Sequence, residues 1–122
     1  MRDRSNNPNV PMNDIVGAVC GTLGVTFEEF HSSSRSCQVV AAREMVVALA
    51  VNLTRLSFPG IARAMRRPNH STAYTALDRW ERRLELSKNN DQSSFILIDG
   101  EAIDPQKVYE AIKGHIERTV AA

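Results

Sequence analysis

Apolar residues recur at helical spacing along most of the chain, so the sequence predicts a mainly helical protein. Residues 13–21 predict a first helix, whose apolar members fall on one stripe: Ile15, Val16, Val19 and Cys20. Gly21 and Gly24 are expected to end this helix. Residues 1–11 lack such a stripe and predict a polar, mobile N-terminal tail.

Two further helices are expected before the middle of the chain. Thr26 and Glu29 have the spacing of a capping box, which predicts a short helical turn with Phe27 and Phe30 pointing inward. Residues 37–54 contain no glycine or proline and are apolar on most sides, which predicts a long, central and mostly buried helix. Its expected core positions are Val40, Val47, Leu49 or Ala50, and Leu53.

The next helix is short and ends in a break. Ser57 is a good N-cap, and Pro59 falls within the first turn, where a missing N–H costs little. The helix is expected to end near Met65. Residues 66–68 then interrupt it, because the residue before a proline avoids the α conformation.

The helix after this break is polar on one face. Asn69 is expected to cap it, and it is predicted to run to about Leu86. Its apolar positions are Ala73, Ala76, Leu77, Trp80 and Leu84. Its opposite face carries Ser71, Thr72, Thr75, Arg79, Arg82 and Arg83. Two helices joined by a tight break, the second with a polar face, are typical of a helix-turn-helix.

The end of the chain predicts a separate extension. Residues 87–94 are polar and resemble a linker, and residues 94–98 are a β-branched run that the Asp99–Gly100 pair ends, which predicts a single strand. The Asp104–Pro105 pair begins a last helix, whose expected inner face is Val108, Ala111, Ile112 and Ile116. This strand and helix form the predicted extension, residues 95–122.

The predicted fold class is therefore mainly α, with a helix-turn-helix domain over residues 12–86 followed by the linker and the strand-plus-helix extension. The 122 residues make one ordinary domain, and 43% hydrophobic content is enough for a core.

Cys20 and Cys37 have no metal-binding spacing and indicate free thiols in a reducing cytosol, with a disulfide between them as the alternative. No apolar run could span a membrane, and the start lacks a signal peptide, which predicts a cytoplasmic protein.

The charges are unevenly placed along the chain. Residues 35–83 carry nine arginines, no lysine and three acids, a net charge of +6, whereas residues 1–34 and 84–122 are net acidic. Guanidinium groups match phosphates and base edges in geometry, so this arginine block favours a nucleic-acid partner. A solvated surface without a partner is the alternative explanation.

The start of the second helix of the pair is the best candidate site. A helix N-terminus offers backbone N–H groups and a partial positive charge to a phosphate. Four short polar side chains at this tip could reach base edges in the major groove, and the same face continues with two more residues: Asn69, His70, Ser71 and Thr72, then Thr75 and Arg79. Asn69 as a simple cap and His70 as an ordinary surface residue are the alternative. The flanking arginines favour the binding site.

Five motifs in this region follow one another in a fixed order: Arg35–Ser36, Arg43, Leu53–Thr54, Ser57–Ile61 and Asn69–Thr72. Their order and spacing, over roughly residues 12–84, resemble the C-terminal, box-binding helix-turn-helix domain of the bacterial replication initiator DnaA. The resemblance implies a Trp-repressor-like helical bundle that binds double-stranded DNA. The phosphate-binding motif GxxxxGK[ST] is missing, so the domain is expected to stand alone, without the initiator's ATPase module.

The resemblance also implies roles for single residues. Arg35 would enter a narrow, A·T-rich minor groove. Arg43 and Thr54 would hold phosphates, and residues 69–72 would read the major groove. Arg66 and Arg67 would add charge against the phosphates. The full set of predicted DNA contacts is Arg35, Ser36, Arg43, Thr54, Ser57, Arg66, Arg67, Asn69, His70, Ser71, Thr72, Thr75 and Arg79.

The sequence departs from the family pattern at three places. A glycine pair and an arginine before the tip are replaced by residues 66–68, and the second basic residue of the loop is Cys37. The aspartate of the tip is Asn69, and asparagine suits adenine whereas aspartate suits cytosine. The preferred DNA sequence is therefore expected to differ from the standard initiator box.

Enzymatic function is not expected, and neither is a metal or small-molecule cofactor. His31, His70 and His115 are far apart in sequence, and the serines of residues 32–34 have no nucleophile-elbow context.

The predicted function is a nucleoid-associated, sequence-specific duplex-DNA binder that regulates replication or transcription. The acidic extension could pair two copies strand to strand or simply cap the core. The alternative function is a protein-interaction module that docks through this extension.

Overall fold

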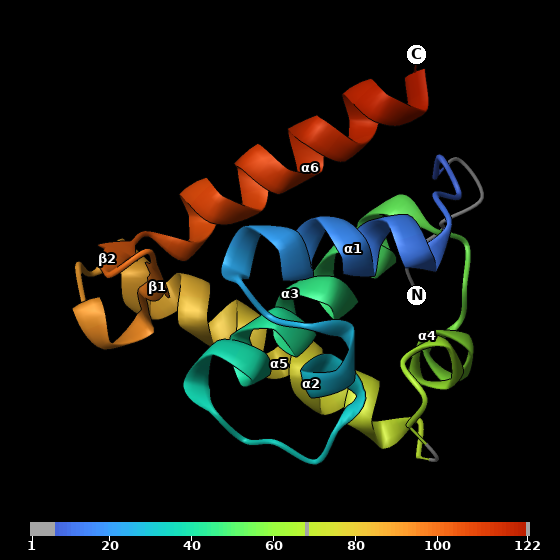
Figure 1. The fold of residues 1–122 in the computed structure, drawn as a ribbon, viewed down its shortest axis with the longest axis horizontal. Coiled ribbons are helices and arrows are strands. Elements are labelled where there is room, and N and C mark those ends of the chain that lie inside the picture. Colours follow the sequence, from blue (N-terminus) through green and yellow to red (C-terminus); the bar gives the residue numbers. More distant parts are fainter. Residues whose placement is uncertain (1–6, 68, 122) are drawn as a thin grey trace.

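The computed structural model describes residues 7–67 and 69–121. Its helices are α1 (Met12–Leu23), α2 (Phe27–His31), α3 (Cys37–Leu53), α4 (Phe58–Ala64), α5 (Ser71–Lys88), the single-turn 3-10 helix η1 (Gln92–Ser94) and α6 (Pro105–Ala121). Two short strands, β1 (Ile96–Ile98) and β2 (Glu101–Ile103), form an antiparallel pair. Figure 1 shows the resulting helical bundle, which confirms the predicted mainly α fold.

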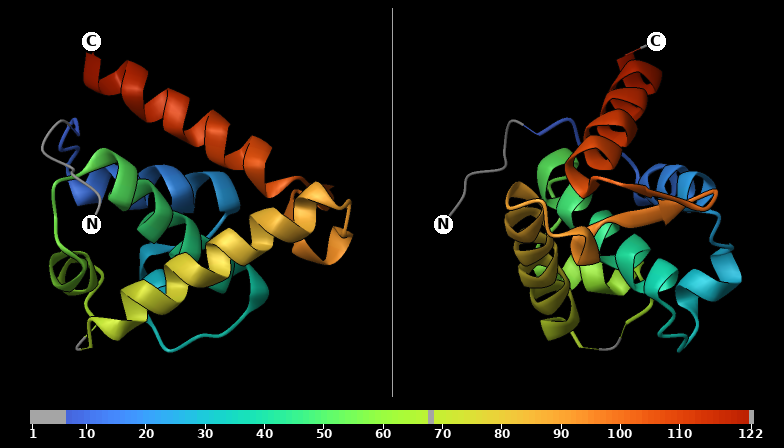
Figure 2. Two further views of the ribbon diagram at one scale, coloured as in Figure 1. Left: turned by 180° about the vertical axis from the view of Figure 1, so that it is seen from behind. Right: turned by 90° about the vertical axis from the view of Figure 1, so that its left-hand side faces the viewer.

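Helix α3 lies at the centre of the bundle. Helices α1, α5 and α6 pack around it, and most of its residues are buried (Figures 1 and 2). The predicted central, buried helix is confirmed. One core position is wrong by a residue: Val39 is buried, whereas Val40 is only half-buried. A helix that is apolar on all sides gives no stripe from which its rotation could be read.

Helix α1 is longer at both ends than the sequence predicts. It continues through Gly21 to Leu23, so the prediction that Gly21 ends it is wrong. Gly24 does end it, with a left-handed backbone (φ 71°) that favours glycine.

The predicted capping box of α2 is confirmed. Thr26 Oγ1 accepts a hydrogen bond from Glu29 N at 3.0 Å, and Glu29 Oε1 accepts one from Thr26 N at 3.1 Å. Phe30 is buried, but Phe27 is 50% exposed, so its predicted inward position is wrong. A helix of five residues has a single inward face, and Phe30 occupies it.

Residues 7–11 are packed against the end of α3. The Asn7 side chain donates to the carbonyls of Val51 (3.0 Å) and Thr54 (2.8 Å). Val10 N donates to Leu53 O at 2.7 Å, and the Val10 side chain is buried. The predicted polar tail is therefore wrong for these residues, and residues 1–6 lie outside the described ranges.

The segment predicted as a linker, residues 87–94, is part of the packed structure. Helix α5 continues to Lys88, and η1 follows it. Ser87 and Ser94 are buried, and Asp91 Oδ1 accepts a hydrogen bond from Ser93 N at 3.0 Å. The polar composition is used for local hydrogen bonds, so the prediction of a free linker is wrong.

The predicted single strand is one half of a β-hairpin. Ile96 pairs with Ile103, and Ile98 pairs with Glu101. The Asp99–Gly100 pair forms the turn, and both residues have positive φ (51° and 82°). Positive φ at both central residues is typical of the tight turn that joins two antiparallel strands. The sequence prediction missed β2 because it took this pair only as the end of a strand.

Helix α6 closes the bundle on one side. It packs against α1, α3 and α5, and its buried residues belong to the common core: Val108, Tyr109, Ile112 and Ile116. Ala111, predicted to face inward, is exposed, so that position is wrong. The extension therefore caps the core, which was one of the two roles that the sequence left open for it.

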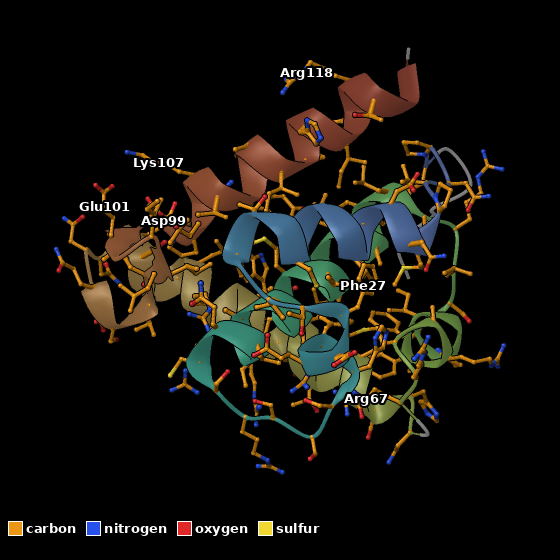
Figure 3. The ribbon with its side chains drawn as sticks, in the orientation of Figure 1. Phe27, Arg67, Asp99, Glu101, Lys107 and Arg118 are labelled. Carbon is orange, nitrogen blue, oxygen red and sulfur yellow. The ribbon has the colours of Figure 1, made fainter. Side chains whose placement is uncertain are left out.

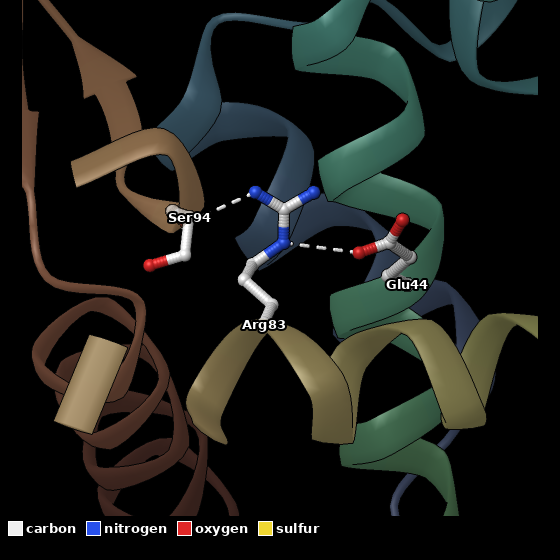
Figure 4. Close-up of polar contacts among 3 residues, drawn as sticks. All are labelled: Glu44, Arg83 and Ser94. Carbon is white, nitrogen blue, oxygen red and sulfur yellow. Dashed lines mark hydrogen bonds and ion pairs between the residues drawn. The ribbon is translucent and has the colours of Figure 1, made fainter. Parts of the chain in front are cut away.

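Two polar contacts of Arg83 join η1 to the centre of the bundle. Arg83 Nε donates to Glu44 Oε1 at 3.0 Å, and Arg83 Nη1 donates to Ser94 O at 3.0 Å (Figure 4). Glu44 and Ser94 are both buried. Arg83 therefore joins α3, α5 and η1, and it does not belong to the exposed polar face on which the sequence placed it.

Candidate nucleic-acid interface

Helices α4 and α5 pack together and form the predicted helix-turn-helix. Ser57 caps α4, because its Oγ accepts a hydrogen bond from Gly60 N at 3.2 Å, and Pro59 lies in the first turn. At the other end, Arg67 N donates to Ala62 O at 2.9 Å, and Arg66 has a left-handed backbone (φ 59°). This is the Schellman geometry for ending a helix, with an arginine where glycine is usual.

The tip before α5 is arranged differently from the prediction. The helix begins at Ser71, and His70 rather than Asn69 occupies the cap position. Asn69 Oδ1 still accepts a hydrogen bond from Ser71 N at 3.0 Å. Thr72 N donates to Asn69 O, and Ala73 N donates to His70 O, both at 3.1 Å. The first N–H groups of the helix are thus occupied, so the expectation that they are free to bind a phosphate is wrong.

The side chains of the tip and of the face behind it are exposed: Asn69, His70, Ser71, Thr72, Thr75 and Arg79. Figures 1 and 2 place α6 and the start of α5 on opposite sides of the molecule. Figure 3 likewise shows Arg67 on the side of the tip, and Lys107 and Arg118 along α6. The extension therefore leaves the tip accessible.

A row of aromatic rings supports the tip. Phe58 of α4 stacks on Tyr74 of α5, with ring centroids 4.1 Å apart and an angle of 20° between the planes. Tyr74 in turn meets the His70 ring edge to face at 6.3 Å. Tyr74 is 49% exposed and therefore available to a ligand. The sequence analysis missed Tyr74, because it sought only short polar and basic residues on this face.

A concave surface of about 680 Å³ lies between α3, α5 and the loop before α3. Seven of the predicted contact residues line it: Arg35, Arg43, Arg67, Ser71, Thr72, Thr75 and Arg79. Residues from three separate segments of the sequence are thus brought to one surface. Glu44, the acid that also lines it, is paired with Arg83. The surface is therefore strongly basic.

Two of these arginines hold the loop between α2 and α3. Arg43 donates four hydrogen bonds to carbonyl oxygens: those of Phe30 (3.0 Å), Ser34 (2.6 Å), Ser32 (2.6 Å) and Glu29 (3.1 Å). Arg67 Nη2 donates to Ser32 O at 3.0 Å and to Phe30 O at 3.4 Å. Burial, and then the nearby Arg67, lower the pKa of Arg43. Within residues 7–67 and 69–121 there is one ion pair, and it joins Arg83 to Glu44. Arg43 and Arg67 therefore have no carboxylate partner in these residues.

The remaining predicted contacts differ in accessibility. Ser36 is exposed and caps α3, and its Oγ accepts a hydrogen bond from Val39 N at 3.4 Å. Ser57 is exposed at the start of α4, and Arg66 is exposed in the turn between α4 and α5. Thr54 is fully buried, and its hydroxyl donates to Ala50 O at 2.7 Å. A buried hydroxyl cannot reach a phosphate, so the predicted role of Thr54 is wrong.

Cys20 and Cys37 do not form a disulfide with each other. Cys20 is buried and Cys37 is exposed, both as free thiols, and burial raises the pKa of the Cys20 thiol. Across the described ranges, no three His, Cys, Asp or Glu residues are grouped so that they could hold a metal ion. No helix there has the length and apolar character needed to cross a membrane.

Comparison with known proteins identifies a family for this chain. The family model described as the bacterial DnaA protein helix-turn-helix matches residues 12–79, which is more than half of the chain. The matched segment runs from the start of α1 to the middle of α5, and it includes every residue of the basic concave surface. No curated protein matches the chain.

Proposed function

Because the chain belongs to the bacterial DnaA helix-turn-helix family, a family of DNA-binding domains, we propose that it is a sequence-specific reader of double-stranded DNA. Its proposed role is to regulate replication or transcription, in association with the nucleoid. The observation that carries this proposal is the exposed tip of α5 beside a concave surface lined by four arginines: Arg35, Arg43, Arg67 and Arg79.

In the proposed complex, the start of α5 enters the major groove. Hydrogen bonds and methyl contacts from residues 69–72 would distinguish the base pairs, because each base pair shows a different pattern of donors and acceptors there. The Oδ1 of Asn69 already accepts from Ser71 N, so its amide N–H groups would face an acceptor on a base. Thr75 and Arg79, on the following turns, would contact the adjacent backbone.

Arg35 would enter the neighbouring minor groove. It is exposed, lies on the loop before α3, and lines the same concave surface as the tip. A narrow, A·T-rich minor groove has an enhanced negative potential, which attracts an arginine. Arg66, exposed beside the turn, would add a phosphate contact that does not depend on sequence.

Selection of a random duplex library on the purified protein tests this proposal. We expect one enriched sequence family, and binding that weakens steeply with salt, with a log–log slope of about −4 to −7 because several phosphates are neutralised. Enrichment of no sequence would contradict specific reading. A failure to bind any duplex at low salt would contradict DNA binding altogether.

The hairpin favours a second candidate function, docking on a protein partner. Leu97 on β1 is 58% exposed, and the nearby Asp99 and Glu101 are exposed acids (Figure 3). An exposed leucine beside carboxylates suits a partner surface that is both apolar and basic. Substitution of Leu97 by Ser should leave duplex binding unchanged, so a pull-down with this variant separates the two functions.

A further inference from the structure

The loop that carries Arg35, residues 32–36, has little of its own to hold it in place. It consists of serines around one arginine, and none of its side chains is buried. Its internal hydrogen bonds run between neighbours, such as Ser34 N to Ser32 Oγ at 3.0 Å. Fixing such a segment costs backbone entropy at every residue, so its conformation depends on contacts from outside.

Those contacts come from two different elements. Arg43 reaches the loop from the second turn of α3 and binds the carbonyls of Ser32 and Ser34. Arg67 reaches it from the turn between α4 and α5 and binds the carbonyl of Ser32 as well. The same oxygen atom therefore accepts hydrogen bonds from both guanidinium groups, at 2.6 Å and 3.0 Å.

This shared acceptor joins the two parts of the proposed reading surface. Arg67 immediately precedes the segment that leads into the tip of α5, and Ser32 begins the loop that presents Arg35. A duplex read in both grooves imposes a fixed distance between the residue in the minor groove and the residues in the major groove. The two arginines set that distance in the free protein.

We propose that Arg43 and Arg67 are positioning residues, which act on DNA through Arg35 by holding its loop against the turn of the helix-turn-helix. This inference rests on the proposed function of the same surface. It differs from the phosphate contacts expected for both residues from the sequence. Arg43 already donates four hydrogen bonds to the protein, which leaves few of its five N–H groups for a ligand.

Substitution by lysine separates the two roles. Arg43→Lys keeps the positive charge but lacks the planar fork of donors that gathers several carbonyls. If Arg43 held only a phosphate, lysine would largely replace it. If Arg43 positions the loop, the variant should lose about 5- to 10-fold in affinity for the duplex selected on the wild-type protein, a range typical of coupled neighbours. Its affinity for a scrambled duplex of the same length should stay unchanged.

A double-mutant cycle with Arg35 gives the decisive measurement. When Arg35 is already alanine, we expect Arg43→Lys to reduce the affinity for the selected duplex by less than about twofold. The loop then carries no arginine that its position could bring to the minor groove. Arg67→Lys should behave in the same way, and its partly exposed side chain makes it the variant less able to disturb folding. Circular dichroism and thermal unfolding identify conditions in which all variants are folded.

The outcomes are distinguishable. A loss that depends on Arg35 supports the inference, and a matching loss of protection of residues 32–36 in hydrogen exchange supports it independently. A loss of equal size with and without Arg35, or no loss in either lysine variant, overturns it. If the wild-type protein selects a duplex and Arg35→Ala weakens that binding, the proposed function stands whatever the lysine variants show.

Discussion

Arg83 and Glu44 form a mostly buried ion pair across the contact between α5 and α3, with Nε and Oε1 3.0 Å apart. The same guanidinium donates a hydrogen bond to the carbonyl of Ser94, so it also holds η1 against α5. Glu44 lines the concave surface, but it is only 4% exposed and its carboxylate is paired with Arg83. Its contribution is therefore expected in stability and not in DNA recognition.

Arg83→Ala should lower the free energy of unfolding by about 2–4 kcal/mol, because it leaves the Glu44 carboxylate buried without its partner. Urea unfolding followed by circular dichroism measures this loss. Replacing both residues, as Glu44→Leu with Arg83→Leu, should recover most of the stability, since the buried charge is then gone. An equally large loss in the double variant would contradict this explanation.

His70→Ala and Arg35→Ala should each weaken binding to the selected duplex by about 1–3 kcal/mol, since each removes a proposed base-edge or minor-groove contact. Fluorescence anisotropy with labelled duplexes measures the change. Arg118→Ala is the matched control, because Arg118 is an exposed arginine on α6, on the side away from the tip (Figure 3). Unchanged binding by both test variants would show that the reading surface lies elsewhere.

Arg66→Gly should separate stability from DNA binding. Arg66 has a left-handed backbone, so glycine there should stabilise the fold by about 0.5–1 kcal/mol. The same substitution should weaken binding to all duplexes about equally and reduce the salt slope by about 1, because one phosphate contact is lost. Chemical unfolding and salt titrations measure the two effects.

Arg63→Gly provides the control for that prediction. Arg63 is also exposed but lies within α4, where glycine should destabilise the helix by about 1 kcal/mol. Opposite signs for the two glycine variants are expected. A loss of stability in both would mean that the left-handed turn does not strain Arg66.

Alanine at two glycines should also have opposite effects. Gly100 has φ +82° in the hairpin turn, so Gly100→Ala should destabilise the protein by about 1 kcal/mol even though no atom crowds its Cβ position. Gly21 lies inside α1 with open space around it, so Gly21→Ala should stabilise by about 0.5–1 kcal/mol. Thermal unfolding of both variants provides the check. A Gly100→Ala variant that is as stable as the wild-type protein would contradict the turn geometry.

Local signals in the sequence predicted local structure well. The capping box of Thr26 and Glu29, the Ser57 cap and the central position of α3 all depend on residues within a few positions of each other, and the structure confirms them. The Asp99–Gly100 pair was an equally local signal for a hairpin. It was missed because the second strand, Glu101–Ile103, is only three residues long and half polar.

The failures at the candidate site concern contacts between distant parts of the chain. Arg43 meets carbonyls 9 to 14 residues before it, and Arg83 meets Glu44 across 39 residues. Such partners are fixed by the packing of helices and have no periodic signature in the sequence. For the same reason the sequence did not show that Thr54 is buried or that Ser94 accepts from an arginine. Seven of the thirteen residues predicted as DNA contacts line the concave surface, but the sequence did not show which of them hold that surface together.

The packing of α6 has a practical consequence for any shortened version of this protein. The segment that carries the family likeness ends at residue 79, yet the side chains that shield Trp80 and the outer side of α1 come from beyond it. Cutting the chain after α5 would leave Ile112 and Ile116 missing from the core and a wide apolar area facing water. Such a fragment should aggregate when expressed. A fusion protein that uses the DNA-reading part therefore has to include α6.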